Sequence, residues 1–200
     1  MKHIFQPGAE KEPTFILLHG TGGDEADLLQ IGQAINPHAS LLGIKGNILE
    51  QGLPRFFKRL AEGLFDEEDL RFRTTELFNF INEAATTYHF DVANSYLIGY
   101  SNGANIAGSL LLTYGDVFAG AMLLHPMVPM RKSHYPRLTN TPIFISAGRN
   151  DNMCTPAETD ELIAIFETSD SEVTGFWHDF GHRLIADEVN EAKRWYTSLR

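Results

Sequence analysis

The chain has 200 residues, of which 43% are hydrophobic and 21% are charged, and these proportions exclude a disordered or fibrous protein. Its 26 acidic residues outnumber its 16 Lys and Arg residues, and the resulting formal net charge of −10 repels a phosphate backbone and argues against nucleic acid as a partner. The length suits one domain, and no repeat or low-complexity linker divides the chain. We therefore expect a single domain over residues 1–200.

The first residues of the chain contain no apolar stretch of the length that a signal peptide has. Apolar runs elsewhere, such as residues 15–18, are far shorter than the ~18 residues that span a bilayer. The one cysteine, Cys154, forms no intramolecular disulfide, which fits a reducing compartment. These features predict a cytoplasmic protein without a membrane span.

Short apolar runs bounded by turn residues predict buried strands. In chain order these strands cover residues 15–18, 40–44, 95–99, 118–124, 142–147 and 173–177, and a weaker candidate over residues 2–6 precedes them. Helical spacing predicts two longer helices between and after them, because apolar residues recur every three or four positions over residues 77–88 and 185–199. Shorter helices are predicted over residues 24–35, 102–114 and 156–166.

Strands that alternate with helices pair in parallel, and the helices then cover both faces of the sheet. The fold class is therefore α/β, with a mostly parallel sheet of about six or seven strands. Ligands of such sheets bind at the carboxyl ends of the strands. Three predicted strands are followed at that edge by Ser101, Asp151 and His182.

Ser101 is the predicted nucleophile. Residues 99–103 read GYSNG, which matches the pattern G-x-S-x-G, and they lie where a predicted strand meets a predicted helix. A sharp turn at this point lifts the serine hydroxyl off the sheet, and the flanking glycines leave room for the tight backbone. A helix cap alone would explain the serine but not a glycine on either side of it.

A serine hydroxyl needs a base to take its proton and a third group to orient that base. In hydrolases with this turn the chain order is Ser, acid, His, and Asp151 and His182 follow Ser101 in that order. Among rival acids, Glu158 and Asp160 fit an exposed helix face, and Asp179 lies too close to His182 along the chain.

Two other histidines are weaker candidates for the base. His178 lies in or at the end of a predicted strand, and His125 follows a strand too early in the order. No pair of histidines at helical spacing indicates a metal site, so we expect none.

Acyl transfer also needs hydrogen-bond donors for the oxyanion, and backbone N–H groups serve well because they are rigid and do not titrate. We expect one from Asn102, directly after the nucleophile, and one from Thr21 in the glycine-rich turn after the first long strand. A plain strand-to-helix loop is one alternative for this turn. A dinucleotide loop is another, but Asp24 and Glu25 stand where that motif needs a further glycine and would repel a pyrophosphate.

Together these segments resemble the small carboxylesterases of the phospholipase/carboxylesterase family, α/β-hydrolases related to acyl-protein thioesterases. The resemblance rests on LHGTGGDE (18–25), GYSNGA (99–104), AGRND (147–151) and FGH (180–182). GLPRFFKR (52–59) and FDEEDL (65–70) look more narrowly like the bacterial branch that includes hydroquinone-resistance hydrolases. The resemblance covers essentially the whole chain. It implies a serine esterase with Ser101, Asp151 and His182 as its triad and Thr21 and Asn102 as its oxyanion donors.

Two positions depart from the family pattern. Lys45 stands where relatives tend to have Arg, and Asn102 stands where thioesterase relatives usually carry Gln. The exchange at position 102 leaves the backbone N–H unchanged but bears on substrate preference.

Residues 46–66 are the longest piece without a clear period. They predict either a short flap or wall over the site or a surface helix with a buried aromatic face. No large cap domain fits in their ~20 residues, so we expect an open site. Candidate substrate contacts are Lys45, Arg55, Phe56, Met127 and Met153, with Lys45 or Arg55 placed to reach an acidic substrate group.

We expect a cytoplasmic serine carboxylesterase that hydrolyses small carboxylic esters through an acyl-enzyme, as a monomer or homodimer, without a cofactor. An acyl thioesterase or lysophospholipase is the nearest alternative and would need a long apolar groove. A non-catalytic binding protein on the same fold is the alternative from another class. A dienelactone-type enzyme would normally have Cys at the position of Ser101.

Overall fold

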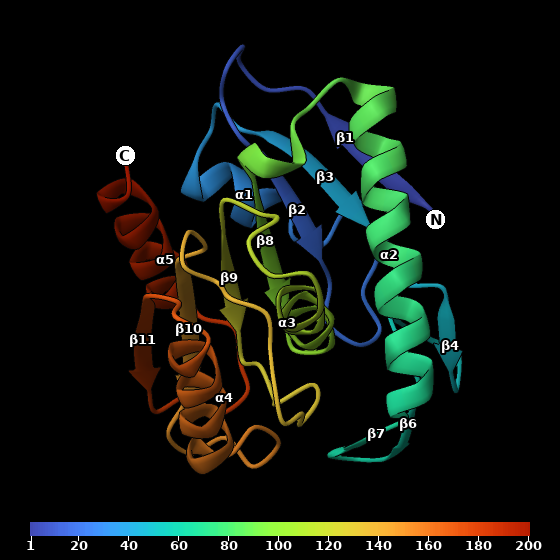
Figure 1. Cartoon of the computed structure of the whole chain (residues 1–200), viewed down its shortest axis with the longest axis vertical. Coiled ribbons are helices and arrows are strands. Elements are labelled where there is room, and N and C mark those ends of the chain that lie inside the picture. Colours follow the sequence, from blue (N-terminus) through green and yellow to red (C-terminus); the bar gives the residue numbers. More distant parts are fainter.

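The computed structural model describes residues 1–200, and a seven-stranded sheet forms its centre (Figure 1). The strands lie in the order β1-β3-β2-β8-β9-β10-β11, and all neighbours pair in parallel except β1, which runs antiparallel to β3. The bounds are β1 His3–Gln6, β2 Thr14–Leu18, β3 Ser40–Ile44, β8 Ser95–Tyr100, β9 Gly120–Leu124, β10 Ile143–Gly148 and β11 Val173–His178. The predicted α/β class and the mostly parallel sheet are confirmed.

Five α-helices cover the sheet, three on one face and two on the other. They are α1 Leu29–Ile35, α2 Glu67–Tyr88, α3 Asn102–Tyr114, α4 Pro156–Thr168 and α5 Ala186–Ser198, and a 3-10 turn, η1 Val92–Asn94, precedes β8. Apolar residues of α2, α3 and α4 pack on one face, and those of α1 and α5 pack on the other. Figure 1 shows the helices around the sheet. None of these helices is both long and apolar enough to cross a membrane.

Strand β2 shows why the sheet sits between two apolar layers. Its residues are all buried, and they alternate between the two cores: Ile16 and Leu18 belong to the layer under α2 and α3, whereas Phe15 and Leu17 belong to the layer under α1 and α5. A strand that is buried on both faces is a continuous apolar run, which is the pattern that predicted it.

Local signals set most of the helix ends. Thr155 caps α4 by accepting a hydrogen bond from the backbone N–H of Glu158, and Gly115 ends α3 with a positive φ of 69°. Helix α1 is shorter than predicted, because residues 24–28 form turns in which the Asp24 side chain accepts from the Ala26 N–H.

The segment over residues 46–66 forms two small hairpins, so a surface helix is the wrong interpretation of it. Strands β4 Ile48–Glu50 and β5 Leu53–Arg55 pair with each other, as do β6 Arg59–Ala61 and β7 Leu64–Phe65. Between them, Phe56 and Phe57 are buried in the main core and anchor the segment. The two hairpins therefore lie beside the carboxyl ends of the parallel strands, where the buried Phe56 and Phe57 hold them to the core.

Candidate active site

Ser101 lies on a strained turn between β8 and α3. Its φ of 52° and ψ of −113° are unfavourable for a residue with a β-carbon, and its backbone N–H donates to the Leu124 carbonyl. A β-carbon at Gly103 would overlap the Leu18 carbonyl, and one at Gly99 would press on the backbone of residues 103 and 104. Both glycines of the G-x-S-x-G pattern are thus required by close backbone approach.

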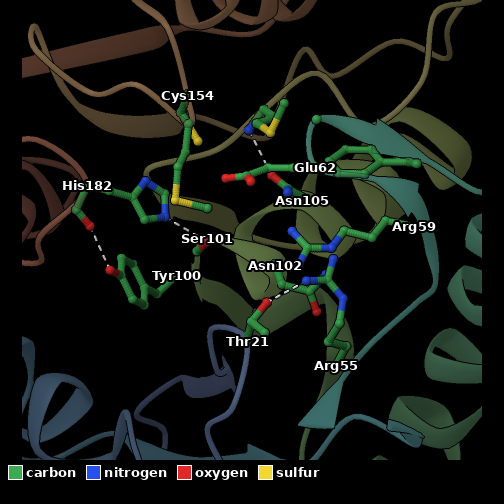
Figure 2. Close-up of a pocket in the computed structure, with 14 residues that line it drawn as sticks. Thr21, Arg55, Arg59, Glu62, Tyr100, Ser101, Asn102, Asn105, Cys154 and His182 are labelled. Atoms are coloured by element: carbon green, nitrogen blue, oxygen red, sulfur yellow. Dashed lines mark hydrogen bonds between the residues drawn. The ribbon is translucent and has the colours of Figure 1, made fainter. Parts of the chain in front are cut away.

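Ser101, His182 and Asp151 form a continuous hydrogen-bonded row. His182 Nε2 lies 2.8 Å from Ser101 Oγ, and His182 Nδ1 lies 2.7 Å from Asp151 Oδ2 (Figure 2 shows the first pair). Because a carboxylate only accepts, Nδ1 carries the proton, which leaves Nε2 as the acceptor for the serine hydroxyl. This arrangement lets the imidazole withdraw a proton from Ser101.

The Asp151 carboxylate is buried and fully engaged. Its Oδ1 accepts the backbone N–H groups of Met153 at 2.8 Å and Cys154 at 3.0 Å, and its Oδ2 faces His182. Burial alone would raise the pKa of Asp151, but the hydrogen bonds from Cys154, His182 and Met153 outweigh it and hold this pKa below its ordinary value. The group is therefore an anion at neutral pH.

The rival acids lie elsewhere. Asp160 and Asp179 are exposed, and the Asp179 carboxylate lies beside the Arg149 guanidinium. Glu158 accepts from the backbone N–H of Val128 and pairs with Arg131. None of the three contacts His182.

Backbone contacts between loops hold the acid and the base together. A β-carbon at Gly148 would overlap the Gly181 carbonyl, and the Gly181 N–H donates to Asn150 Oδ1 at 2.7 Å. The Tyr100 hydroxyl donates to the His182 carbonyl at 2.7 Å (Figure 2). The loops after β10 and β11 therefore meet directly above the turn that carries Ser101.

Thr21 and Asn102 line the same cavity as Ser101 (Figure 2). The Thr21 N–H has no protein acceptor, and the Asn102 N–H lies in the first turn of α3, where N–H groups have no acceptor within the helix. Arg55 Nη1 donates to Thr21 Oγ1 at 2.7 Å, and the Gly22 N–H donates to the Pro54 carbonyl. The hairpin β4–β5 thus fixes the loop that presents the Thr21 N–H.

Only one of the two polar atoms of the Asn102 side chain is hydrogen-bonded. Its Oδ1 accepts the Phe56 N–H at 2.7 Å, while its buried Nδ2 has no partner. Burying an unpaired donor costs free energy. Since Asn102 also lines the cavity, this unpaired donor belongs to a residue of the cavity wall.

The cavity over Ser101 has a volume of ≈ 290 Å³. Of the predicted substrate contacts, Arg55, Met127 and Met153 line it, whereas Lys45 and Phe56 do not. The prediction for Phe56 was wrong because its side chain is 1% exposed and packs in the core against His19. Lys45 directly follows β3, outside the cavity wall, and its backbone N–H donates to the Lys2 carbonyl.

Seven further residues line the cavity that were not predicted as substrate contacts. They are Arg59, Glu62, Gly63, Phe65, Tyr100, Asn105 and Cys154. Tyr100 occupies the variable position of the G-x-S-x-G pattern, and the others come from the hairpin β6–β7, from α3 and from the loop after β10. Arg59, Phe65 and Tyr100 lie within motifs quoted from the sequence, and Asn105 directly follows one.

Two arginines on this wall share one carboxylate. Arg55 Nε lies 3.1 Å from Glu50 Oε2 and Arg59 Nε lies 2.8 Å from Glu50 Oε1. Burial and the neighbouring Arg59 charge lower the pKa of Arg55 from its ordinary value, and Glu50 opposes them. The charge of Arg55 is thus already paired with Glu50, and its contact at the cavity is the hydrogen bond to Thr21.

Cys154, the lone thiol, also borders the cavity. It is 2% exposed, and its Sγ donates to the His125 carbonyl at 3.3 Å. Burial and the Asp151 charge raise the pKa of this thiol far above its ordinary value. It therefore lacks the thiolate that a cysteine nucleophile requires.

Residues 56–194 match the family model described as the dienelactone hydrolase family. The chain is 50% identical over 196 residues to the putative hydrolase MhqD of Bacillus subtilis, with 98% of each chain covered. A Bacillus cereus carboxylesterase structure is 51% identical, with a TM-score of 0.98 over 100% of this chain and 95% of that one. YahD, solved with malic acid, is 32% identical, with a TM-score of 0.95 over 100% and 99%.

Proposed function

Since the chain belongs to the dienelactone hydrolase family and is an ester-hydrolysing enzyme, we propose that it is a serine carboxylesterase acting on small esters through Ser101, His182 and Asp151. The observation that carries the proposal is the hydrogen-bonded row of these three side chains, with spacings of 2.8 and 2.7 Å, of which Ser101 and His182 line a cavity. A nucleophile, its base and the group that orients the base are the parts that acyl transfer needs.

In acylation, Ser101 Oγ attacks the ester carbonyl carbon while His182 Nε2 takes the hydroxyl proton. The carbonyl oxygen becomes an oxyanion, and the N–H groups of Thr21 and Asn102 stabilise it. His182 then returns its proton to the departing alkoxide, which leaves as an alcohol, and Ser101 holds the acyl group. Asp151 stabilises the imidazolium while it exists but stays ionised.

Deacylation repeats these steps with water. His182 takes a proton from a water molecule, whose oxygen attacks the acyl carbon, and the same two N–H groups stabilise the second oxyanion. Collapse of this intermediate releases the carboxylic acid and returns the proton from His182 to Ser101 Oγ. The cycle consumes one ester and one water and needs no cofactor.

The family name suggests a cysteine nucleophile, but the residues favour serine. The nucleophile position on the turn after β8 holds Ser101, and Cys154 is a buried thiol held by the His125 carbonyl. A dienelactone-type chemistry that depends on a thiolate thus has no group to perform it in this chain.

Cavity size supports small esters over the alternatives. A volume of ≈ 290 Å³ lies at the lower end of small-molecule sites, which hold ~300–1,000 Å³. An acyl thioesterase or lysophospholipase would need a longer apolar groove than this, and the charged groups Arg59 and Glu62 on the wall do not offer one. We therefore propose short acyl and alcohol groups as the substrate class.

The test compares wild type with Ser101→Ala on p-nitrophenyl esters of increasing acyl length and with a fluorophosphonate probe. We expect Ser101→Ala to lose at least about 10⁴-fold in kcat and all probe labelling. Iodoacetamide should leave the wild type active, because Cys154 is buried and protonated.

Equal labelling of wild type and Ser101→Ala would refute the nucleophile assignment. A folded wild type without turnover on any short ester would favour a binding protein. Turnover that rises steadily toward long acyl chains would favour the thioesterase or lysophospholipase alternative.

A further inference from the structure

A second histidine, besides His182, contacts Asp151. His125 follows β9, is 0% exposed, and holds a positive φ of 54° that few residues with a β-carbon adopt. Its Nδ1 lies 3.2 Å from Asp151 Oδ2 and its Nε2 lies 2.9 Å from Glu188 Oε1. The ring therefore bridges two buried carboxylates.

The two carboxylates determine how His125 is protonated. The pKa of Glu188 is held below its ordinary value because hydrogen bonds from His125, Ser146 and the Ile185 N–H outweigh burial, and Asp151 is likewise an anion. An ionised carboxylate only accepts hydrogen bonds, so both ring nitrogens of His125 must carry protons. His125 is thus an imidazolium in the protein interior.

The charges around His125 agree with this assignment. Burial lowers the pKa of His125, but the hydrogen bonds and charges of Glu188 and Asp151 outweigh it and raise the pKa above its ordinary value. The groups that face the ring from the packed elements are Asp151, Cys154 and His182 from the site loops, Tyr100 from β8, His178 from β11 and Glu188 from α5.

These side chains also bring metal-binding atoms together, since those of His125, His178 and Glu188 lie within 4.8 Å of one another. However, the Phe180 N–H donates to His178 Nδ1 at 3.1 Å, so the proton of this ring is on Nε2. That Nε2 lies 3.3 Å from Glu188 Oε1 and donates to it. With no free lone pair on the facing nitrogens, the cluster is a hydrogen-bond network.

We propose that His125 and Glu188 are positioning residues for catalysis: the His125 imidazolium, anchored by Glu188, holds Asp151 Oδ2 in the direction of His182. The inference rests on the proposed function, since it extends the row to Ser101-His182-Asp151-His125-Glu188. Ser146 Oγ and the Ile185 N–H, each 2.7 Å from Glu188, fix the far end of the row.

The bridge has an electrostatic consequence for the base. Asp151 and Glu188 contribute two negative charges and His125 one positive charge, so the resting cluster carries −1, as a single carboxylate would. The ring of His125 lies 5.0 Å from that of His182, so the two rings would repel each other if both were positively charged. Replacing His125 should therefore change the pH dependence of catalysis.

The protonation state is tested directly by ¹⁵N NMR of the histidine side chains in wild type and in Glu188→Gln at pH 7.5. We expect two protonated ring nitrogens at His125 in the wild type and only one in Glu188→Gln. A wild-type His125 with a single protonated nitrogen would overturn the inference, and the wild-type measurement depends neither on turnover nor on the folding of a variant.

The catalytic effect is tested by the pH dependence of kcat/KM in His125→Asn, since Asn tolerates a positive φ. We expect the midpoint of the acidic limb to rise by about one pH unit, because a positive charge beside His182 is lost. The plateau should fall about tenfold as Asp151 loses one of its partners.

Asn36→Ala is the matched control for lost stability. Asn36 is buried and donates to the Tyr196 hydroxyl, but it lies at the carboxyl end of α1 and does not line the cavity. Its midpoint should stay at the wild-type value. An unchanged midpoint in His125→Asn would refute the positioning role if Ser101→Ala is inactive, whereas an active Ser101→Ala would refute the proposed function itself.

Discussion

Thr21 has two groups with separate roles in the proposed mechanism. Its backbone N–H has no protein acceptor and is left for the oxyanion, whereas its hydroxyl accepts from Arg55 and holds the loop. Substitution by proline removes the N–H, while substitution by serine keeps both the N–H and the hydroxyl. We expect Thr21→Pro to lose about 10²–10³-fold in kcat and Thr21→Ser to stay within about threefold of wild type.

Steady-state kinetics on a short p-nitrophenyl ester measures both variants, with circular dichroism to verify folding. The loss in Thr21→Pro should appear in kcat more than in KM, because the oxyanion exists only in the transition state. A folded Thr21→Pro enzyme with near wild-type kcat would show that another donor serves the oxyanion.

The sequence predicted site residues best where a catalytic residue type stood directly after a predicted strand. Ser101, Asp151 and His182 were each placed after a predicted strand, and the structure brings their side chains into hydrogen-bond contact. Glu188 had only a weak signal, a charged residue on the apolar stripe of α5. Its contact with His125 depends on where α5 packs against the sheet, which chain order does not reveal.

Among the secondary-structure elements, the turn from β8 into α3 is the most constrained, because α3 begins in contact with the end of β2. A β-carbon at Gly103 would overlap the Leu18 carbonyl, so the helix would have to move. We expect Gly103→Ala to lower the free energy of unfolding by about 1–3 kcal/mol and to reduce kcat by displacing Ser101. Urea unfolding and ester kinetics measure the two effects.

Gly108→Ala is the matched control, since it makes the same substitution in the same helix. A β-carbon there would make only ordinary contacts, at 3.5 Å or more, with Pro129 and Phe166. Replacing an interior helix glycine by alanine should then stabilise the protein by about 0.5–1 kcal/mol without changing kcat. Equal effects of the two substitutions would contradict a steric role for Gly103.

The two hairpins over residues 46–66 are secondary-structure elements that the sequence did not predict. Their strands are only two or three residues long, too short for an alternating pattern to show. Phe56 and Phe57 are buried, and with Leu60 and Leu64 they follow a helical spacing, but those two leucines are exposed on the hairpin β6–β7. Anchoring by two adjacent aromatic residues is a tertiary effect, and it turns Arg55 toward Thr21 while it hides Phe56 in the core.

At the scale of the whole molecule, the alternation of strands and helices predicted the fold class because each element carries its own period. The strand order β1-β3-β2-β8-β9-β10-β11 was not predicted, since it depends on which edge each crossover takes. That order brings the ends of β8, β9, β10 and β11 side by side, and with them Ser101, His125, Asp151 and His182.

This clustering of buried charge links stability to pH. The pKa values of Asp151 and Glu188 are lowered on folding from ordinary values of 3.8 and 4.5, so their stabilisation is present above these values and is lost as pH falls below them. The pKa of His125 is raised above 6.5, so its contribution is complete below 6.5 and is lost as pH rises through the higher folded value. Stability should be greatest between these two limits.

Urea unfolding at pH 3.5, 6 and 9 tests this dependence on wild type and Glu188→Gln. We expect the wild type to lose about 1–3 kcal/mol between pH 6 and pH 3.5 and Glu188→Gln to lose less over that interval, since one of the two carboxylates is absent. Toward pH 9 the variant should lose its His125 contribution earlier than wild type, because the stronger partner of the imidazolium is gone.

Glu161→Gln separates this buried effect from that of a surface pair. Glu161 also has a lowered pKa, caused by its hydrogen bond with Arg131, but its side chain is 42% exposed and water screens the pair. Its substitution should leave the pH dependence of unfolding close to that of wild type. The contrary outcome is that Glu161→Gln reduces the loss of unfolding free energy between pH 6 and pH 3.5 as much as Glu188→Gln does. In that case the net charge of −10 over the whole chain would explain the loss, rather than the buried carboxylates.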